Sequence, residues 1–326
     1  MVRFFNITEL LSNETGFFEF QNEIIQASYN SIGRSYSSHL NEVALVTNLI
    51  ETLNGMSYNE NNCNILLSAS KIHGSKSFVD FNFRNIQTSK EFGDMVIISL
   101  ITNGNERLFQ RICIIQNKKS SNQKWAIDRQ QLFLLKNFPR FEGKSGIFHG
   151  KNDILFRNRS GCLGAFGLLF APGEMMFISA PFVSGFLKPN KSLSASDITF
   201  PPSHQPQDST GYIGYFGNPL SYVDHDGGIE TSQNFFSYIY WFFGNFRFGD
   251  DIYDFIRAWT QFNVGEITLW GGGIVNQEVD SFANQLIISA ELGEGIDFSK
   301  NERNIDLKLK GDMAVFLLRM DIGKKA

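Results

Sequence analysis

The stretch that decides the fold is EFGDMVIISLITNGNERLFQRICIIQNKKS, residues 91–120. Two nearly continuous apolar runs, 95–100 and 108–115, are separated by the turn-forming residues Asn103-Gly104-Asn105. This pattern predicts a β-hairpin with a short loop. Continuous apolar runs are typical of strands covered on both faces, so the hairpin is expected at the centre of a sheet.

The segments around the hairpin predict helices and further strands. Apolar residues recur at spacings of three and four over 39–53, which predicts an amphipathic helix. Residues 64–68 and 78–83 have strand-like patterns. A second helix is expected from Asp128, a plausible N-cap, to Pro139, which cannot continue a helix. The order helix, strands, hairpin, helix indicates an α/β domain.

The remainder of the chain has a less regular pattern. Residues 154–156 are strand-like, and the Pro- and Ser-rich segment 188–212 is typical of a long loop or linker. Residues 235–246 are apolar on every side and too short for a membrane span, which favours a buried helix over the alternative of a self-association face. An amphipathic helix is expected over 250–262 and a terminal strand over 313–320.

Length and composition suggest two parts in one cytoplasmic chain. The chain has 326 residues, 42% of them hydrophobic, which is more than one compact domain usually needs. We therefore expect a domain over 1–160 and an α+β region over 161–326. Three cysteines without CxxC spacing fit a reducing compartment, and the N-terminus lacks a signal-peptide pattern.

The charge is distributed unevenly along the chain. The formal net charge is −4, yet 103–160 holds 12 basic and four acidic residues, a local charge of +8. Such a segment can attract a phosphate backbone, although a solvated charged face explains it equally well. From Gly228 onward the balance is −5, which disfavours nucleic acid and predicts a region that binds a regulatory protein or a second copy of the chain.

Three polar side chains are expected to converge at one end of the hairpin. The midpoint of positions 94 and 116 is 105, inside the loop, so antiparallel pairing places Asp94 within a residue or two of Gln116. Gln116 and Lys118 project from the same face because strand side chains alternate. Phosphodiester hydrolysis uses oxygen ligands for a divalent cation and a group that positions water or offsets charge on the phosphate. A carboxylate, an amide oxygen and an ammonium group can supply these parts.

The pattern resembles the PD-(D/E)xK restriction-endonuclease-like superfamily over roughly residues 38–140. Gln116 stands where that family has Asp or Glu, and this D-QxK variant is similar to nuclease domains of bacterial anti-phage effectors. The tract Trp125-Ala126-Ile127-Asp128 is similar to the start of the helix that follows the active strand. The resemblance implies a central mixed sheet flanked by helices and a metal-dependent endonuclease, with double-stranded DNA as the expected substrate.

The resemblance also implies a role for each site residue. Asp94 would be the principal ligand of Mg²⁺ or Mn²⁺, Gln116 a neutral oxygen ligand, and Glu42 a second carboxylate from the first helix. Lys118 would position water or stabilise the phosphate. The nearby basic residues Lys119, Lys124 and Arg129 are expected to bind nucleic acid.

Several alternatives remain open. Glu91 and Asp80 are rivals for the carboxylate role, and Gln116 could mark an inactive nuclease fold used only for interaction. The substrate could also be RNA. Other motifs give no competing chemistry: the run 271–273 lacks the Lys-Ser/Thr of a phosphate-binding loop, the five histidines lack metal-site spacing, and no GxSxG elbow is present.

Overall fold

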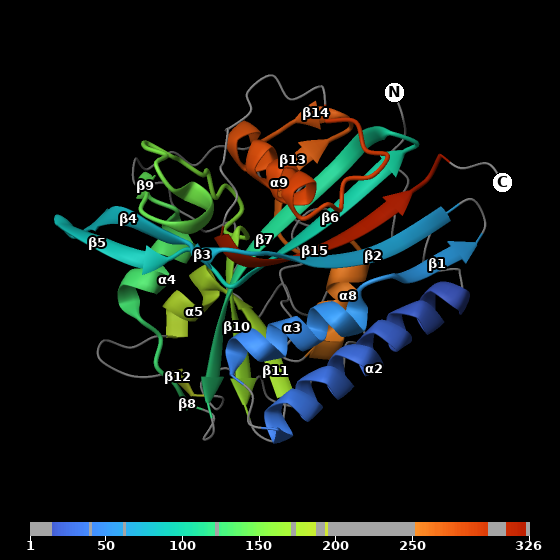
Figure 1. Ribbon diagram of the computed structural model, residues 1–326, viewed down its shortest axis with the longest axis horizontal. Helices are drawn as coiled ribbons and strands as arrows, with labels where there is room; N and C mark the ends of the chain where they lie inside the picture. The colour runs from blue at the N-terminus through green and yellow to red at the C-terminus, as the bar shows by residue number, and fades with distance from the viewer. Residues whose placement is uncertain are drawn as a thin grey trace, which may run out of the picture.

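A large mixed sheet forms the centre of the protein (Figure 1). The computed structural model describes residues 15–38, 41–60, 63–120, 124–170, 174–186, 193–194, 252–298 and 311–323. The main strand order is β1-β2-β15-β6-β7-β10-β11, in which β15 runs parallel to β6 and β10 parallel to β7. The strands are β1 (Met56–Glu60), β2 (Cys63–Ile72), β15 (Gly311–Asp321), β6 (Met95–Asn103), β7 (Glu106–Ser120), β10 (Gly164–Phe170) and β11 (Glu174–Ser179).

The predicted hairpin is confirmed as β6 and β7, which pair antiparallel from Asn103↔Glu106 to Met95↔Ile115. Gly104 takes a left-handed φ of 61° in the turn, a conformation that glycine adopts without strain. Every β6 residue before Asn103 is buried, as expected for a strand covered on both faces. On the other edge of β7, β13 (Glu266–Trp270) pairs with the first half of the strand and β10 with the second half.

Helices cover both faces of the sheet and define two apolar clusters. One cluster joins Ile97, Cys113 and Ile115 to the helices α2 (Thr15–Ser37), α3 (Glu42–Leu53) and α8 (Ile252–Thr260). The opposite cluster joins Ile98 and Ile114 to α4 (Arg129–Asn137), α5 (Ala180–Phe186) and α9 (Gln277–Ser289). Because neighbouring strand residues point to opposite faces, the apolar runs of the hairpin supply both clusters.

Smaller elements complete the fold. A three-stranded sheet of order β5-β4-β9 packs beside α4, and β8 and β12 form a separate two-stranded sheet. In the main sheet, the short strands β14 and β3 pair with β13 and β15. The remaining elements are β3 (Ser75–Lys76), β4 (Phe78–Phe83), β5 (Ile86–Glu91), β8 (Lys124–Trp125), β9 (Phe141–Gly143), η1 (Gly146–Phe148), β12 (Leu193–Ser194) and β14 (Gly273–Ile274). None of the helices in the described residues is both long and apolar enough to cross a membrane.

Most predicted elements agree with the structure, with one error. The helix predicted over 39–53 is α3, where Asn41 accepts a hydrogen bond from the Ala44 N–H. The helix predicted from Asp128 to Pro139 is α4, which begins after the predicted N-cap Asp128. The predicted strand at 154–156 is wrong: only an isolated bridge joins Ile154 to Phe141. Asp153 has a left-handed φ of 60°, which interrupts extended backbone, and the apolar residues there are buried from a loop.

Residues beyond 160 contribute strands to the same sheet as residues before 160. The sheet therefore continues across the expected boundary between 1–160 and 161–326. The predicted strand at 313–320 lies within β15, which occupies a central position between β2 and β6. The predicted helix at 250–262 contains α8. The apolar segment 235–246 lies outside the described residues, as does 188–212 except for β12, which pairs with β8.

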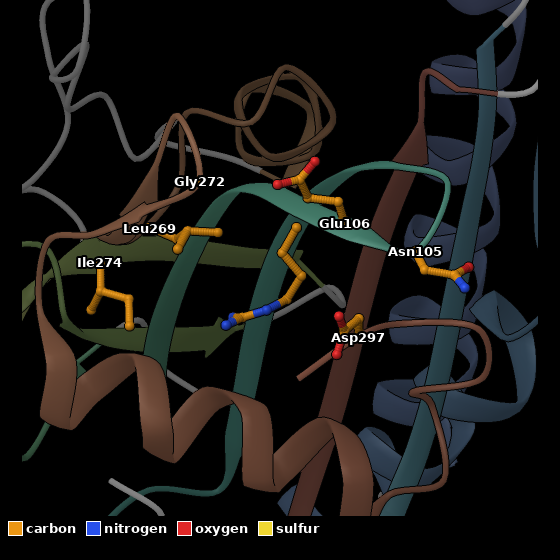
Figure 2. Close-up of a pocket in the computed structure, with 7 residues that line it drawn as sticks. Asn105, Glu106, Leu269, Gly272, Ile274 and Asp297 are labelled. Atoms are coloured by element: carbon orange, nitrogen blue, oxygen red, sulfur yellow. The ribbon is translucent and has the colours of Figure 1, made fainter. Parts of the chain in front are cut away.

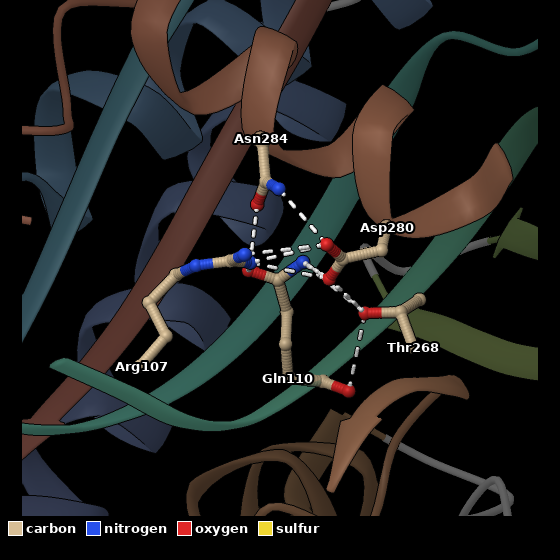
Figure 3. Close-up of polar contacts among 5 residues, drawn as sticks. All are labelled: Arg107, Gln110, Thr268, Asp280 and Asn284. Carbon is tan, nitrogen blue, oxygen red and sulfur yellow. Dashed lines mark hydrogen bonds and ion pairs between the residues drawn. The ribbon is translucent and has the colours of Figure 1, made fainter. Parts of the chain in front are cut away.

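A buried polar network fastens α9 to the hairpin (Figure 3). Arg107 of β7 forms an ion pair with Asp280 of α9 at 3.1 Å and donates to Asn284 Oδ1 at 2.6 Å. Gln110 donates to both Asp280 and Thr268, so three elements share one set of hydrogen bonds. Because each charge has a partner, the network avoids the cost of an isolated buried ion.

Candidate functional site

The site lies where β7 extends beyond its partner β6. The pairing of β6 with β7 ends at Met95↔Ile115, whereas β7 continues to Ser120 and pairs with β10 on its other edge. Alternate N–H groups of a strand point to the same edge at about 7 Å spacing. The N–H groups of Asn117 and Lys119 therefore face an edge from which β6 has departed.

Two carboxylates occupy that edge. The Asn117 N–H donates to Oδ2 of Asp94 at 2.6 Å, and the Lys119 N–H donates to Oε1 of Glu42 at 2.7 Å. Glu42 is the first residue of α3, so the start of this helix is fastened to β7. Two acids from different elements are thus held by backbone N–H groups two residues apart on β7.

The backbone of Asp94 is fixed on both sides. Its N–H donates to the Ile115 carbonyl at 2.9 Å, and its own carbonyl accepts from the Ala314 N–H at 3.1 Å. Strands β7 and β15 therefore hold the residue that immediately precedes β6. The predicted proximity of Asp94 to Gln116 agrees with this register.

Gln116 contacts Asp94 directly and leaves one polar atom without a partner. Its Nε2 donates to Oδ2 of Asp94 at 2.5 Å, while its Oε1 is buried and has no hydrogen-bond partner among the described residues. The side chain is only 3% exposed. An unsatisfied buried amide oxygen is costly, and such groups call for a ligand or ordered solvent.

Lys118 lies two residues further along β7, opposite Leu168 of β10 and on the same face as Gln116. Its side chain is half-buried, and its ammonium has no hydrogen bond or ion pair within the described part of the chain. The positive charge of Lys118 is close enough to lower the pKa of Asp94. Lys118 is therefore an unneutralised cation beside the carboxylate.

The environment raises the pKa of Asp94 to about 7. Burial is the largest cause, followed by the negative charge of Glu91, and the charge of Glu42 acts in the same direction. The Asn117 hydrogen bond and the Lys118 charge oppose the rise without cancelling it. The ionised form of Asp94 is therefore disfavoured in this position, and a cation that binds there stabilises it.

This raised pKa predicts how the stability of the metal-free protein depends on pH. The unfolded chain loses the Asp94 proton near its ordinary pKa of 3.8 and the folded chain near 7, so Asp94 lowers stability as pH rises between these values. Asp94→Asn removes this penalty, and we expect it to stabilise the protein by on the order of 2 kcal/mol at pH 8. The gain should shrink towards pH 5. Urea unfolding in EDTA at both pH values measures it, and an equal or negative effect at both would contradict the assignment.

The rival carboxylates occupy different positions. Glu91, at the end of β5, forms an ion pair with Lys76 at 3.0 Å while its charge still raises the pKa of Asp94, so it belongs to the rim of the site. Asp80 lies on β4 in the three-stranded sheet, with the Lys144 ammonium 3.9 Å away. Glu91 therefore remains a candidate ligand, whereas no contact among the described residues joins Asp80 to Asp94.

The predicted nucleic-acid-binding residues are placed around the site with different surroundings. The Lys119 ammonium lies 4.8 Å from the centre of the Tyr36 ring, a cation–π contact with α2. Lys124 on β8 and Arg129 at the start of α4 are exposed. Other members of the basic segment are internal, since Arg107 and Arg111 are buried and Arg140 forms an ion pair with Asp153. Fewer basic side chains are consequently available on the surface than the local charge of +8 suggested.

Asn117 is a part of the site that the sequence did not single out. Its side chain is fully buried, and neither its Oδ1 nor its Nδ2 has a hydrogen-bond partner in the described part of the chain. Gly167 of β10 makes room for it: an added Cβ there would lie 2.3 Å from Asn117 Oδ1. Its backbone N–H contacts Asp94, a role that only strand register could have revealed.

The residues offer an oxygen donor set for a divalent cation. Asp94, Glu42 and the free Oε1 of Gln116 are hard oxygen ligands of the kind that Mg²⁺ and Mn²⁺ prefer. The described residues contain no group of three or more His, Cys, Asp or Glu side chains that could hold a metal. The candidate site therefore depends on the amide as a third donor, and its net charge is lower than that of a three-carboxylate site.

A separate pocket lies at the opposite end of the hairpin (Figure 2). It has a volume of about 490 Å³ and is lined by Asn105, Glu106, Arg107, Leu269, Gly272, Ile274 and Asp297. The charge of Arg107 is already paired with Asp280, and the acids Glu106 and Asp297 would repel a phosphate. None of the predicted site residues lines this pocket.

Comparisons with known proteins do not assign the chain to a family. No family model matches the sequence, and no curated protein or solved structure shows significant similarity.

The three cysteines are free and buried, so none of them forms a disulfide.

Proposed function

We propose that this chain is a metal-dependent endonuclease of the PD-(D/E)xK type, with double-stranded DNA as its expected substrate. The observation that carries the proposal is the open end of the β6–β7 hairpin, where β7 extends beyond β6. There Asp94 is hydrogen-bonded to Gln116 on the adjacent strand, with the unpaired Lys118 two residues away on the same face. The order of α3, the hairpin and α4 within a mixed sheet supports the same proposal.

Each side chain would have a distinct task. Asp94, Glu42 and Gln116 Oε1 would hold Mg²⁺ or Mn²⁺, which when bound supplies a Lewis acid for the phosphate and lowers the pKa of a water molecule. Lys118 would orient that water or stabilise negative charge on the phosphate. The Asn117 and Lys119 N–H groups would orient the two carboxylates.

The proposal is tested by incubating purified protein with supercoiled plasmid DNA and with structured RNA, each in Mg²⁺, in Mn²⁺ and in EDTA. We expect cleavage of the DNA that requires a divalent cation. Cleavage of RNA alone would change the substrate class, and no cleavage of either would favour the inactive nuclease-fold alternative. Placing such an activity in anti-phage defence rests on the sequence resemblance alone.

Gln116→Glu is expected to strengthen metal binding. A carboxylate in place of the amide adds a negative charge beside Asp94, so the Mg²⁺ concentration for half-maximal cleavage should fall about tenfold. Gln130→Glu is the matched control because it makes the same charge change on α4, where Gln130 accepts from Thr88. A Mg²⁺ titration of plasmid cleavage compares the variants. Equal Mg²⁺ dependence in Gln116→Glu and the wild type would argue against Gln116 as a ligand.

A further inference from the structure

The β4–β5 hairpin projects from the body of the protein (Figure 1). Its strands pair from Phe78↔Glu91 to Phe83↔Ile86, which leaves a two-residue turn of Arg84 and Asn85. Both turn residues are left-handed, with φ of 52° and 65°. This is the geometry of a type I′ turn, which matches the twist of a β-ribbon and gives it a defined shape.

The hairpin is fastened to α4 along most of its length. Phe81 and Phe83 pack against Phe133, with ring centres 6.2 and 5.2 Å apart. Polar contacts add to this anchoring: Thr88 donates to Gln130 at 2.9 Å, and Lys90 forms an ion pair with Asp128 at 2.6 Å. The ribbon is therefore held in one orientation relative to the core. The contacts reach Phe83, next to the turn, and the Arg84 guanidinium lies 5.3 Å from the centre of the Phe83 ring.

The tip carries the side chains that contact nucleic acids in grooves. Asn82, Arg84, Asn85 and Gln87 are exposed, and residues 82–88 contain no acid. Arg, Asn and Gln are the residue types that pair most directly with base edges. Ile86 is 65% exposed, the most exposed large apolar side chain among the described residues, although a hairpin needs no apolar residue there.

The tip is connected to the candidate site by a short and rigid path. Strand β5 ends at Glu91, three positions before Asp94, and Ile86 lies five positions before Glu91. At a rise of about 3.3 Å per residue the tip extends about 17 Å from that end. This is half of the roughly 34 Å helical repeat of duplex DNA, so both ends of the ribbon can contact one duplex.

We propose that the β4–β5 hairpin is a duplex-binding ribbon whose tip enters a groove of the nucleic acid bound at the Asp94 site. Arg84, Asn85 and Gln87 contact base edges or the groove walls, and Ile86 packs against bases as an apolar wedge. The inference rests on the proposed nuclease function and adds an element that aligns the duplex. The tip carries one cation and no acid, so its charge is complementary to a polyanion such as duplex DNA.

The test measures duplex binding and cleavage for tip variants that preserve the turn. Arg84→Asn/Asn85→Gly keeps the left-handed turn and removes the long cationic side chain, and Ile86→Ser removes the wedge. Arg157→Ala and Ile288→Ser are matched controls, because Arg157 is exposed and Ile288 is 53% exposed on α9. Binding is followed by fluorescence anisotropy of a labelled mixed-sequence duplex in EDTA, and cleavage by plasmid nicking in Mg²⁺.

We expect each tip variant to raise the Kd for the duplex at least fivefold and to slow plasmid cleavage, with urea unfolding midpoints and both control variants unchanged. If the wild type cleaves DNA and the tip variants bind and cleave equally well, the ribbon proposal is overturned while the nuclease proposal stands. If the wild type neither binds nor cleaves nucleic acid, the nuclease proposal fails first. A tip variant that changes the molar mass in solution, but not the duplex affinity, would assign the hairpin to a protein contact and also overturn the proposal.

Discussion

Lys118→Ala is expected to reduce phosphodiester cleavage more than a hundredfold while the fold and most of the nucleic-acid affinity remain. Lys118 is the unpaired cation on the face of β7 that carries Gln116, and its charge acts on Asp94. A positioned cation that stabilises charge developing on a phosphate contributes several kcal/mol to the transition state. In binding, the same lysine is one of several basic residues, so its loss changes the affinity little. Single-turnover cleavage and anisotropy measure the two effects separately.

Lys119→Ala is the matched control for this prediction. Lys119 is the next residue on the same strand, but its side chain projects to the other face and contacts the Tyr36 ring. Its contact with Glu42 uses the backbone N–H, which alanine retains. We therefore expect a small loss of affinity and a normal single-turnover rate. Similar losses of rate in both variants would indicate that general positive charge, rather than the position of Lys118, supports cleavage.

The parts of the fold with local signals were predictable from the sequence. The apolar runs on each side of Asn103-Gly104-Asn105 specify the hairpin, because both strands are buried on both faces and the turn fixes the register. The proximity of Asp94 and Gln116 follows from that register alone. Helices α3 and α4 were predictable because both have apolar residues at helical spacing, and α4 also begins after the recognisable N-cap Asp128.

Other parts depend on long-range packing that no local pattern encodes. Helix α2 was not predicted, although its 23 residues bury Phe17, Phe20 and Ile24 against the sheet. Glu42 was placed at the site only by the family resemblance, and its contact with the Lys119 N–H required the structure. The burial of Arg107 is a third example, because its partner Asp280 lies 173 residues away in the chain. The sequence alone could not distinguish it from a surface cation.

The central position of β15 has the largest consequence for the organisation of the chain. The local pattern predicted a strand at 313–320, but such a pattern does not show whether the strand lies at the edge or at the centre of a sheet. Instead, β15 pairs antiparallel with β2 along Met313–Asp321 and parallel with β6 along Ala314–Asp321. Parallel neighbours of this kind join segments far apart in the chain, so their pairing partners cannot be found from local propensity.

Ending the chain after Lys310 is therefore expected to abolish folding rather than release a nuclease from a regulatory half. The truncation removes β15, whose buried residues Val315, Phe316 and Leu318 fill both apolar clusters. It also leaves the facing edges of β2 and β6 unpaired and takes away the Ala314 N–H that holds the Asp94 carbonyl. Burial of a single large apolar side chain contributes about 2 kcal/mol, so the loss of the whole strand exceeds the 5–15 kcal/mol that typically stabilises a folded protein.

Circular dichroism and urea unfolding of the truncated chain measure this effect, with a chain ending after Gly323 as the control that keeps all of β15. We expect no cooperative unfolding transition in the first and a normal transition in the second. A truncated chain that still unfolds cooperatively and cleaves DNA would show that β15 is dispensable and that residues beyond 310 act only on regulation. Since we expect the opposite, regulation by the C-terminal half has to be tested with point substitutions on its surface, which leave the shared sheet intact.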